Sequence, residues 1–306
     1  MITDKITIAI PVYERIDFFE EALNSALSQT VSCPVYVIDN ASTHNKFQEI
    51  VEKQNNSLVT YIRNEKNLGM IGNWNRCIDV CQTEYLSILH DDDVLHPGFV
   101  ECCLKFLSKN PSQKCCFAVS TVAGKDSSVF LHQHVRKEKN RRFKKINFLF
   151  GNLVAFPGVL FPVTIAKKTG GFKEEEYPLH DFDFWIRLSD HIPLFVSNLP
   201  YAFYRKHSQQ TSAIEYLNFI DKFYERRQRL FSNLLGFFWF FSMWSLYCSY
   251  INNCNYYNSE INIGRDIKNP KILRWFIFFR KTSVGLLRYI YIYSCRIFIY
   301  LVTRIS

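Results

Sequence analysis

The sequence predicts an α/β protein built on a mainly parallel, doubly wound sheet. Four short apolar segments in the first 90 residues alternate with segments whose apolar residues recur at helical spacing. Such alternation is typical of a parallel sheet with helices on both faces. The 306 residues are 48% hydrophobic and 21% charged, which allows a sizeable core and excludes a disordered or fibrous chain.

The first four expected strands are short apolar runs closed by polar residues, as in strands that are buried on both faces. They lie at Ile6–Val12, Pro34–Asp39, Leu58–Arg63 and Tyr85–Leu89. A helix is expected after each strand, at Phe19–Leu27, at Asn45–Gln54, at Met70–Cys81, and from Pro97, which suits a first helical turn, to Asn110.

The pattern is less regular in the next hundred residues. A fifth strand is expected at Cys115–Val122, a helix at Asp181–Asp190, and further strands within Ile192–Arg205. The segment Lys137–Lys145 is rich in Lys and Arg, and we interpret it as a solvated loop or the start of a helix.

The last part of the chain differs in composition and predicts a second region. Residues 222–306 carry 13 Lys and Arg against three Asp and Glu, so they account for the net charge of +9. Leu230–Ile251 has no charged residue, and Leu273–Ile305 mixes aromatic residues with Lys and Arg. We therefore expect residues 216–306 to form a basic, aromatic-rich helical extension on an anionic membrane surface, with 230–251 spanning or lying on the bilayer. The alternatives are core helices of a second domain and nucleic-acid binding, which the apolar density disfavours.

The cysteines and the N-terminus bear on the compartment. The ten Cys residues include no C-x-x-C pair, which favours buried free thiols over a zinc site or a disulfide framework. Met1–Lys5 leads directly into a short strand and lacks the apolar stretch of a secretory signal. The expectation is a cytoplasmic protein held peripherally at the inner face of the membrane.

Polar residues follow each of the first four strands, where ligands bind to open parallel sheets. They are Tyr13 and Glu14; Asp39, Asn40 and Ser42; Asn64, Asn67 and Gly69; and His90, Asp91, Asp92 and Asp93. Three consecutive carboxylates repel one another, and a bound Mg²⁺ or Mn²⁺ would remove that cost. The alternative is a solvated acidic turn before the next helix. The chain contains neither G-x-x-x-x-G-K-[ST] nor G-x-G-x-x-G, so a metal would have to handle phosphate charge.

These residues and a later set resemble one known family. The first set comprises Pro11-Val12-Tyr13, residues 37–43 (VIDNAST), Asn64 with Asn67-Leu68-Gly69, and residues 89–95 (LHDDDVL). The second comprises residues 169–172 (TGGF), 180–188 (HDFDFWIRL) and 204–208 (YRKHS). In this order and spacing, over residues 5–212, they are similar to the family 2 glycosyltransferases. The resemblance implies the GT-A fold and an inverting, metal-dependent catalytic domain at residues 1–215.

The resemblance also implies a role for each donor-site position. The residues near the nucleotide would be Pro11, Val12 and Tyr13 at the base, Asp39 as its acceptor, and Asn67 and Gly69 in an N-x-G turn. In the D-x-D region, Asp91 would bind the donor, and Asp92 and Asp93 the metal. Arg205 and His207 match a late loop that closes on the diphosphate, where His207 also reaches the metal. His90 stands at the first Asp of the common D-x-D-D form, which leaves the role of that position open.

Asp181 matches the catalytic base of the family, and His180 replaces the Glu that usually precedes it. Asp183 is the alternative base. On a helix it would point about 200° away from Asp181, so only one of the two should face the site. A helix N-cap is the structural alternative for Asp181.

The function implied by the resemblance is transfer of a sugar from a nucleotide donor to a glycan or lipid-linked acceptor, as in the synthesis of bacterial O-antigen, lipooligosaccharide or capsule. A non-catalytic nucleotide-sugar-binding or scaffold protein at the membrane is the alternative. A processive synthase would need a Q-x-x-R-W segment, and Lys271–Trp275 lacks the Gln.

Overall fold

The computed structural model describes residues 2–207, with gaps at 112–113, 129, 131–137, 151 and 153, and five single residues beyond. The chain divides into two compact units: Met1–Lys145 with Val154–His207, and Ile146–Leu153 with Ser208–Ser306. The expectations for residues 216–306, including the stretches at 230–251 and 273–305, lie outside the described residues. No helix in the described part is both long and apolar enough to cross a membrane.

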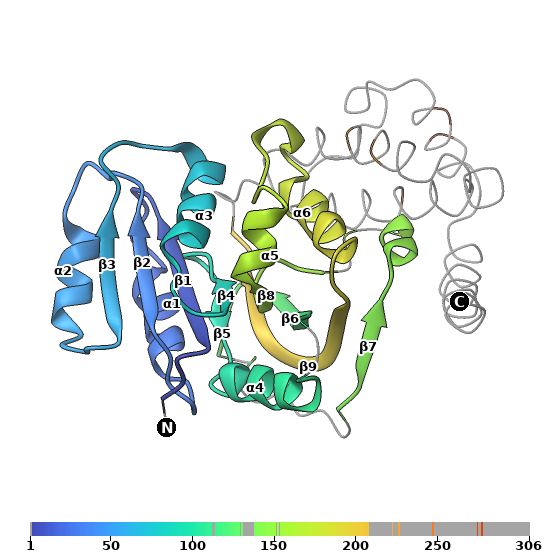
Figure 1. The fold of residues 1–306 in the computed structure, drawn as a ribbon. Helices are drawn as coiled ribbons and strands as arrows, with labels where there is room; N and C mark the ends of the chain where they lie inside the picture. Colours follow the sequence, from blue (N-terminus) through green and yellow to red (C-terminus); the bar gives the residue numbers. More distant parts are fainter. Residues whose placement is uncertain are drawn as a thin grey trace. The chain divides into compact units, whose positions relative to one another are not determined.

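Over its described residues, the first unit is built on one nine-stranded sheet (Figure 1). The strands are β1 (Ile6–Val12), β2 (Val35–Asp39), β3 (Val59–Arg63), β4 (Tyr85–Ile88), β5 (Val94–Leu95), β6 (Cys116–Gly124), β7 (Asn140–Phe143), β8 (Val159–Pro162) and β9 (Leu194–Arg205). Their order in the sheet is β3-β2-β1-β4-β8-β6-β9-β5, and β7 also pairs with β9. Every residue of β1, β4 and β8 is buried, as expected for strands that are covered on both faces.

The direction of the strands follows the prediction only in the first half of the sheet. Strands β1 to β4 are parallel to one another. Strand β8 then lies antiparallel between β4 and β6, and β5 and β7 run antiparallel to β9. Strands β6 and β9 are parallel to each other, but the other pairings of this half are antiparallel, so the sheet is mixed and the prediction of a mainly parallel sheet is wrong for the second half. Four apolar residues such as those of β8 have the same composition in either direction, so hydrophobicity does not encode it.

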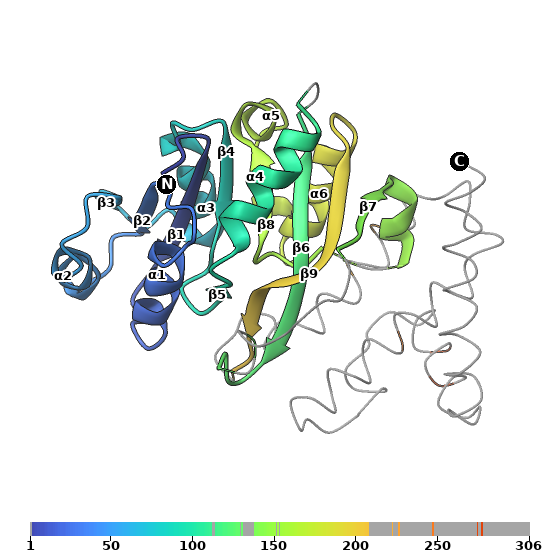
Figure 2. The ribbon, with the colours of Figure 1, turned by 90° about the horizontal axis from the view of Figure 1, so that it is seen from below.

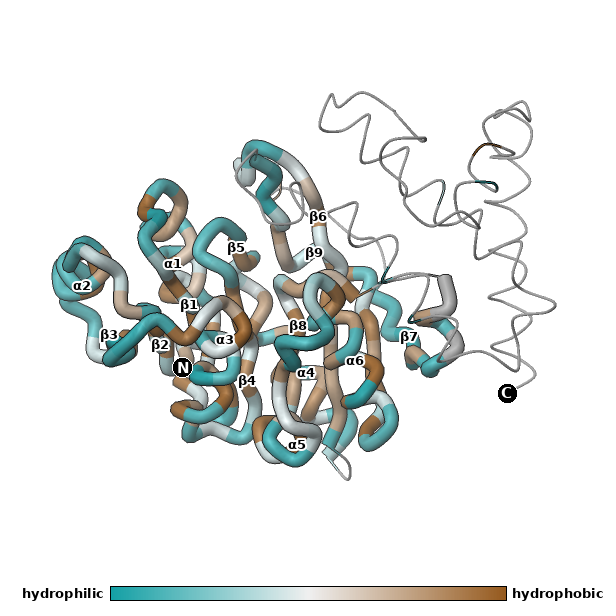
Figure 3. Tube along the Cα trace, turned by 90° about the horizontal axis from the view of Figure 1, so that it is seen from above, coloured by the Kyte–Doolittle hydropathy of each residue, from teal (hydrophilic) through white to brown (hydrophobic). Residues whose placement is uncertain are grey.

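Helices cover both faces of the sheet (Figure 2). They are α1 (Phe19–Leu27), α2 (Lys46–Lys53), α3 (Gly69–Val80), α4 (Phe99–Lys109), α5 (Val163–Lys168) and α6 (His180–Ser189), with a 3-10 turn at Glu174–Glu176. A second 3-10 turn, at Lys145–Phe150, belongs mostly to the second unit. Helices α1, α2 and α4 share one core, in which Phe19, Phe47 and Phe99 are fully buried. On the other face, α3 and α6 contribute aromatic rings to a second packed layer. Most residues of α2 are hydrophilic (Figure 3).

Two local expectations are wrong. The expected loop or helix start at Lys137–Lys145 contains, in its described part, strand β7 paired with β9. Arg141 and Arg142 of this strand are exposed, so their charges stay in water while the backbone pairs. Helix α4 begins at Phe99 rather than in the turn at Pro97. The seven cysteines among the described residues are buried free thiols, as predicted.

Candidate active site at the carboxyl ends of the strands

The loops that follow β1, β2, β3, β4 and β9 meet at one edge of the sheet. The first four strands are parallel neighbours, so the residues after them lie on the same side. The end of β9 joins them because β5, directly after the acidic residues, pairs through Val94 and Leu95 with Phe203 and Ala202.

The acidic residues after β4 are largely buried, and two of them bond to the same arginine side chain. Asp92 is 8% exposed and Asp93 is fully buried. Nη2 of Arg15, in the loop after β1, donates to Asp91 Oδ1 at 2.6 Å and to Asp92 Oδ2 at 2.7 Å. No pattern in the sequence singles out Arg15, because its partners lie 76 and 77 residues further along the chain.

The end of β9 brings Arg205 and His207 to the same acids. The backbone N–H of Arg205 donates to Asp93 Oδ1 at 3.0 Å, and its Nε donates to the carbonyl of Asp92 at 2.9 Å. The guanidinium also pairs with Glu21 of α1. His207 Nε2 lies 3.0 Å from Asp92 Oδ2. Main-chain and side-chain bonds from β9 therefore fix the acidic loop.

Three side chains of the cluster have the chemistry and spacing of a cation site. One ligand atom from each of His90, Asp92 and Asp93 lies within 4.8 Å of the other two. Among the described residues, His90 Nε2 and Asp93 Oδ2 are buried without a hydrogen-bond partner, which is costly unless a ligand completes them. Two carboxylates and an imidazole fit a divalent cation such as Mg²⁺ or Mn²⁺. His90 is thus a candidate ligand in addition to the predicted Asp92 and Asp93. His207, the third predicted ligand, contacts this cluster by its approach to Asp92.

The protonation of the three acids reflects burial and mutual repulsion. Burial raises the pKa of Asp91 to about 7, against the opposing charge of Arg15. Burial and the charge of Asp92 raise the pKa of Asp93 well above its ordinary value. Burial also acts on Asp92, but His90 and Arg15 outweigh it and hold the pKa of Asp92 below its ordinary value. A further cation would therefore stabilise the fully ionised cluster.

Asp39 ends β2 and is fully buried. Its Oδ1 accepts from the backbone N–H and the hydroxyl of Ser42 at 2.9 and 2.6 Å, and its Oδ2 accepts from the hydroxyl of Tyr61. Burial and this bond to Asp39 raise the pKa of Tyr61 to about 12. The guanidinium of Arg63 lies 3.8 Å from the same carboxylate. Tyr61 and Arg63 thus join Asp39 at this position, although the sequence pattern does not point to them.

The side chain of Asn40 ties the loops after β2 and β3 together. Its Nδ2 donates to Asn67 Oδ1 at 2.8 Å and to the carbonyl of Gly69 at 3.1 Å, and its Oδ1 accepts from the N–H of Leu68. Gly69 has a φ of +73°, a backbone conformation that favours glycine. The N-x-G spacing follows from this turn.

The three residues at the end of β1 differ in exposure. Pro11 and Val12 are buried in the sheet beside Ile38 and Asp39. Tyr13 is 45% exposed, so its side chain is open to a ligand.

The two acids at the start of α6 lie in different surroundings. Asp181 is half-buried, and its Oδ1 accepts from the N–H of Phe182 at 2.6 Å. Asp183 is fully buried and accepts from Arg187 Nε at 2.6 Å. Arg187 also donates to the carbonyls of Thr169 and Gly171, each at 2.7 Å, which ties the helix to the preceding turn. The Asp183–Arg187 pair is therefore built into the packing of the helix.

Two histidines that replace acids of the family pattern lie against Trp74. The ring of His90 stacks on it at 5.1 Å, and the ring of His180 meets it edge-on at 4.7 Å. Burial lowers the pKa of His90 to about 4 and that of His180 to about 3. Both imidazoles are therefore neutral at neutral pH.

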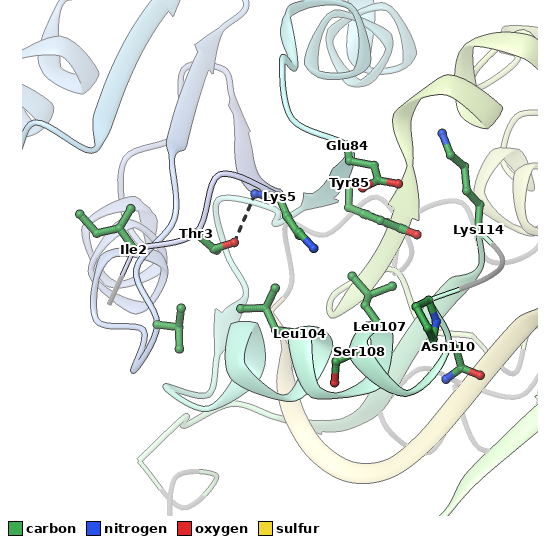
Figure 4. Close-up of a pocket in the computed structure, with 12 residues that line it drawn as sticks. Ile2, Thr3, Lys5, Glu84, Tyr85, Leu104, Leu107, Ser108, Asn110 and Lys114 are labelled. Carbon is green, nitrogen blue, oxygen red and sulfur yellow. Dashed lines mark hydrogen bonds between the residues drawn. The ribbon is translucent and has the colours of Figure 1, made fainter.

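A pocket of about 630 Å³ opens at the opposite edge of the sheet (Figure 4). Its lining includes Lys5, just before β1, and Tyr85, the first residue of β4, together with Leu104 and Leu107 of α4. It therefore lies at the amino ends of the strands, across the sheet from the acidic residues.

Comparison with known proteins identifies the family. Residues 7–163 match the sequence family described as glycosyl transferase family 2. The chain belongs to glycosyl transferase family 2. The chain is 26% identical to the chondroitin synthase of Pasteurella multocida over 186 residues, which are 60% of this chain and 19% of the synthase. It is 25% identical to an uncharacterized glycosyltransferase of Methanocaldococcus jannaschii over 187 residues, or 60% of this chain and 63% of that protein.

Solved structures support the fold. The crystal structure of S. aureus TarS 1–349 in complex with UDP-GlcNAc matches 72% of this chain and 65% of its own, with a TM-score of 0.54 and 17% identity. At this identity the likeness concerns the fold, an α/β sheet with flanking helices. The predicted family is thus confirmed, and the predicted fold is confirmed as an α/β sheet with flanking helices.

Proposed function

We propose that this glycosyltransferase moves a sugar, with inversion, from a nucleotide-sugar donor to a hydroxyl of a glycan or lipid-linked acceptor. The observation that carries the proposal is the convergence of buried Asp91, Asp92 and Asp93 with Arg205 and His207 at one strand edge. Such a set suits a diphosphate whose negative charge grows as the sugar leaves. The UDP-GlcNAc complex of S. aureus TarS supports a nucleotide-sugar donor.

A divalent cation, Mg²⁺ or Mn²⁺, would be held by His90, Asp92 and Asp93, with His207 beside Asp92. When bound, it would supply positive charge to the leaving diphosphate. Asp91 and Arg205 would orient the donor on the same side. The base end of the nucleotide would lie over the loops that contain Pro11, Val12, Tyr13, Asp39, Asn67 and Gly69.

Asp181 is the proposed catalytic base. It would take the proton of the acceptor hydroxyl while that oxygen bonds to the anomeric carbon and the diphosphate leaves from the opposite face. The buried contact between Asp183 and Arg187 supports this choice, because the carboxylate of Asp183 already bonds within α6.

The acceptor is proposed from the relatives and from the composition of the tail. Proteins named chondroitin synthase and hyaluronan synthase are among the relatives, which favours a glycan acceptor. The basic, aromatic residues 222–306 favour a lipid-linked acceptor at an anionic membrane. We therefore place the reaction in the synthesis of a bacterial envelope polysaccharide such as O-antigen, lipooligosaccharide or capsule, at the cytoplasmic face of the membrane.

The test is a panel of nucleotide sugars with Mn²⁺, read by thermal unfolding and by release of the nucleoside diphosphate. Binding to the folded state raises the melting temperature, so the true donor should stand out. Asp92→Ala should lose the metal-dependent shift and the turnover, whereas Asp79→Ala, at an exposed position of α3, should keep both. A shift without turnover, for any acceptor or water, would favour a binding or scaffold protein. Turnover that survives both EDTA and Asp92→Ala would contradict the metal assignment.

A further inference from the structure

Arg15 lies in the loop after β1, and hydrogen bonds to the loop after β2 fix the backbone of this loop. The preceding residue, Glu14, has a φ of 56°, in the left-handed region that non-glycine residues rarely adopt. The N–H of Glu14 donates to Ser42 Oγ at 3.0 Å, and its carboxylate accepts from the N–H and the hydroxyl of Thr43 at 2.8 and 3.0 Å. The loop after β2 therefore fixes the backbone from which Arg15 extends.

The guanidinium of Arg15 bonds to two of the three clustered acids. Its Nη2 bridges Asp91 Oδ1 and Asp92 Oδ2, and its Nη1 lies 3.2 Å from His207 Nε2. The guanidinium carbon lies 5.9 Å from the centre of the Phe18 ring. The side chain as a whole is 23% exposed, while its Nε is buried without a hydrogen-bond partner among the described residues.

A divalent cation and Arg15 would compete for the carboxylate of Asp92. The proposed ligands include Asp92, whose Oδ2 already accepts from Arg15 and contacts His207. A cation bound to Asp92 would face the guanidinium at short range in a partly buried site, where like charges repel strongly. A diphosphate would relieve the conflict, because a guanidinium binds phosphate oxygens at least as well as carboxylates.

We propose that Arg15 is a resident counter-cation that competes with the divalent cation for Asp92 and moves to the diphosphate when the donor binds. This inference rests on the proposed function, since it assumes a metal and a diphosphate at the acidic cluster. It makes Arg15 a positioning residue that keeps metal affinity low until the donor arrives, and so couples the binding of the two.

The coupling predicts opposite changes in two binding constants of the full-length chain, neither of which requires turnover. Mn²⁺ alone is titrated and followed by the electron paramagnetic resonance of the free ion. Inorganic pyrophosphate alone, without metal, is titrated by calorimetry. Arg15→Gln should bind Mn²⁺ about tenfold more tightly, because a like charge is removed, and should bind pyrophosphate about tenfold more weakly. Arg76→Gln, which removes an exposed arginine of α3, should match the wild type in both.

The charge-preserving variant Arg15→Lys separates the charge from the shape of the side chain, and circular dichroism checks that each variant folds. Arg15→Lys should keep the weak Mn²⁺ binding of the wild type but bind pyrophosphate less well, since an ammonium lacks the planar fork. Unchanged or weaker Mn²⁺ binding by Arg15→Gln, or no Mn²⁺ binding by any form, would overturn the inference. The donor panel tests the proposed function separately, since a nucleotide sugar can be turned over whichever result Arg15 gives.

Discussion

Replacing His180 should change how the stability of the first unit depends on pH. This imidazole is 7% exposed, lies edge-on to Trp74 and has a pKa of about 3, chiefly because burial disfavours its charged form. In the unfolded chain the pKa returns to about 6.5. Acidification therefore favours the unfolded chain, which binds a proton that the folded chain rejects.

The magnitude follows from the difference between the two pKa values. The stabilisation is fully present above pH 6.5 and is lost as the pH falls towards 3. At pH 5 the unfolded imidazole lies about 1.5 pH units below its pKa, so the loss is about 2 kcal/mol. His90, with a pKa of about 4, contributes in the same direction. Asp91, with its pKa raised to about 7, opposes both, because its protonation stabilises the fold as the pH falls.

The difference between wild type and His180→Gln isolates this one group. Urea unfolding of the full-length chain at pH 7 and pH 5, followed by tryptophan fluorescence, gives the free energy of unfolding at each pH. Between these values the wild type should lose about 2 kcal/mol more than His180→Gln. His191→Gln, at an exposed position just beyond α6, is the control for removing an imidazole. Equal losses in wild type and His180→Gln would refute the reasoning, since His180 would then accept its proton inside the fold.

Two further predictions concern the chemistry and the tail. Asp181→Asn should keep donor affinity but lower turnover by about 10²-fold or more, the usual effect of losing a general base. Asp183→Asn should instead lower the melting temperature. Full activity of Asp181→Asn would show that another residue is the catalytic base. Replacing Arg280, Lys281 and Arg288 together by Gln should weaken sedimentation of the full-length chain with anionic liposomes, by about 1 kcal/mol for each charge. Sedimentation equal to that of the wild type would argue against a membrane-bound tail.

The sequence predicts where the site lies better than it predicts the contacts among the residues of the site. Parallel strands carry their carboxyl ends to one edge, so Asp39, Gly69 and Asp91 could be placed together from strand assignments alone. The late residues Arg205 and His207 were predictable only through the family resemblance. Their contact with Asp92 depends on the pairing of β5 with β9, and no local sequence pattern predicts that pairing.

The residues that the sequence analysis missed share a physical reason. Arg15, Tyr61 and Trp74 act through partners in other segments of the chain, and each has an ordinary alternative as a surface cation or a core ring. The antiparallel β8 was missed because burial on both faces hides strand direction. The spacing of apolar residues predicts which face of a segment is buried. It does not predict the partner of a buried polar group, because that partner comes from a distant part of the chain.

Strand β9 carries a consequence for which changes this protein can accept in evolution. It pairs with β5, β6 and β7, and irregularities in its pairing with β6 beside Ser120 set its register. Because side chains alternate along a strand, inserting or deleting one residue upstream of Arg205 would turn that side chain to the opposite face. Substitutions at the exposed and partly exposed positions of β9 should therefore be tolerated, while changes of its length should be selected against. Among descendants of this gene, the spacing from Leu194 to Arg205 should vary less than the residues that fill it.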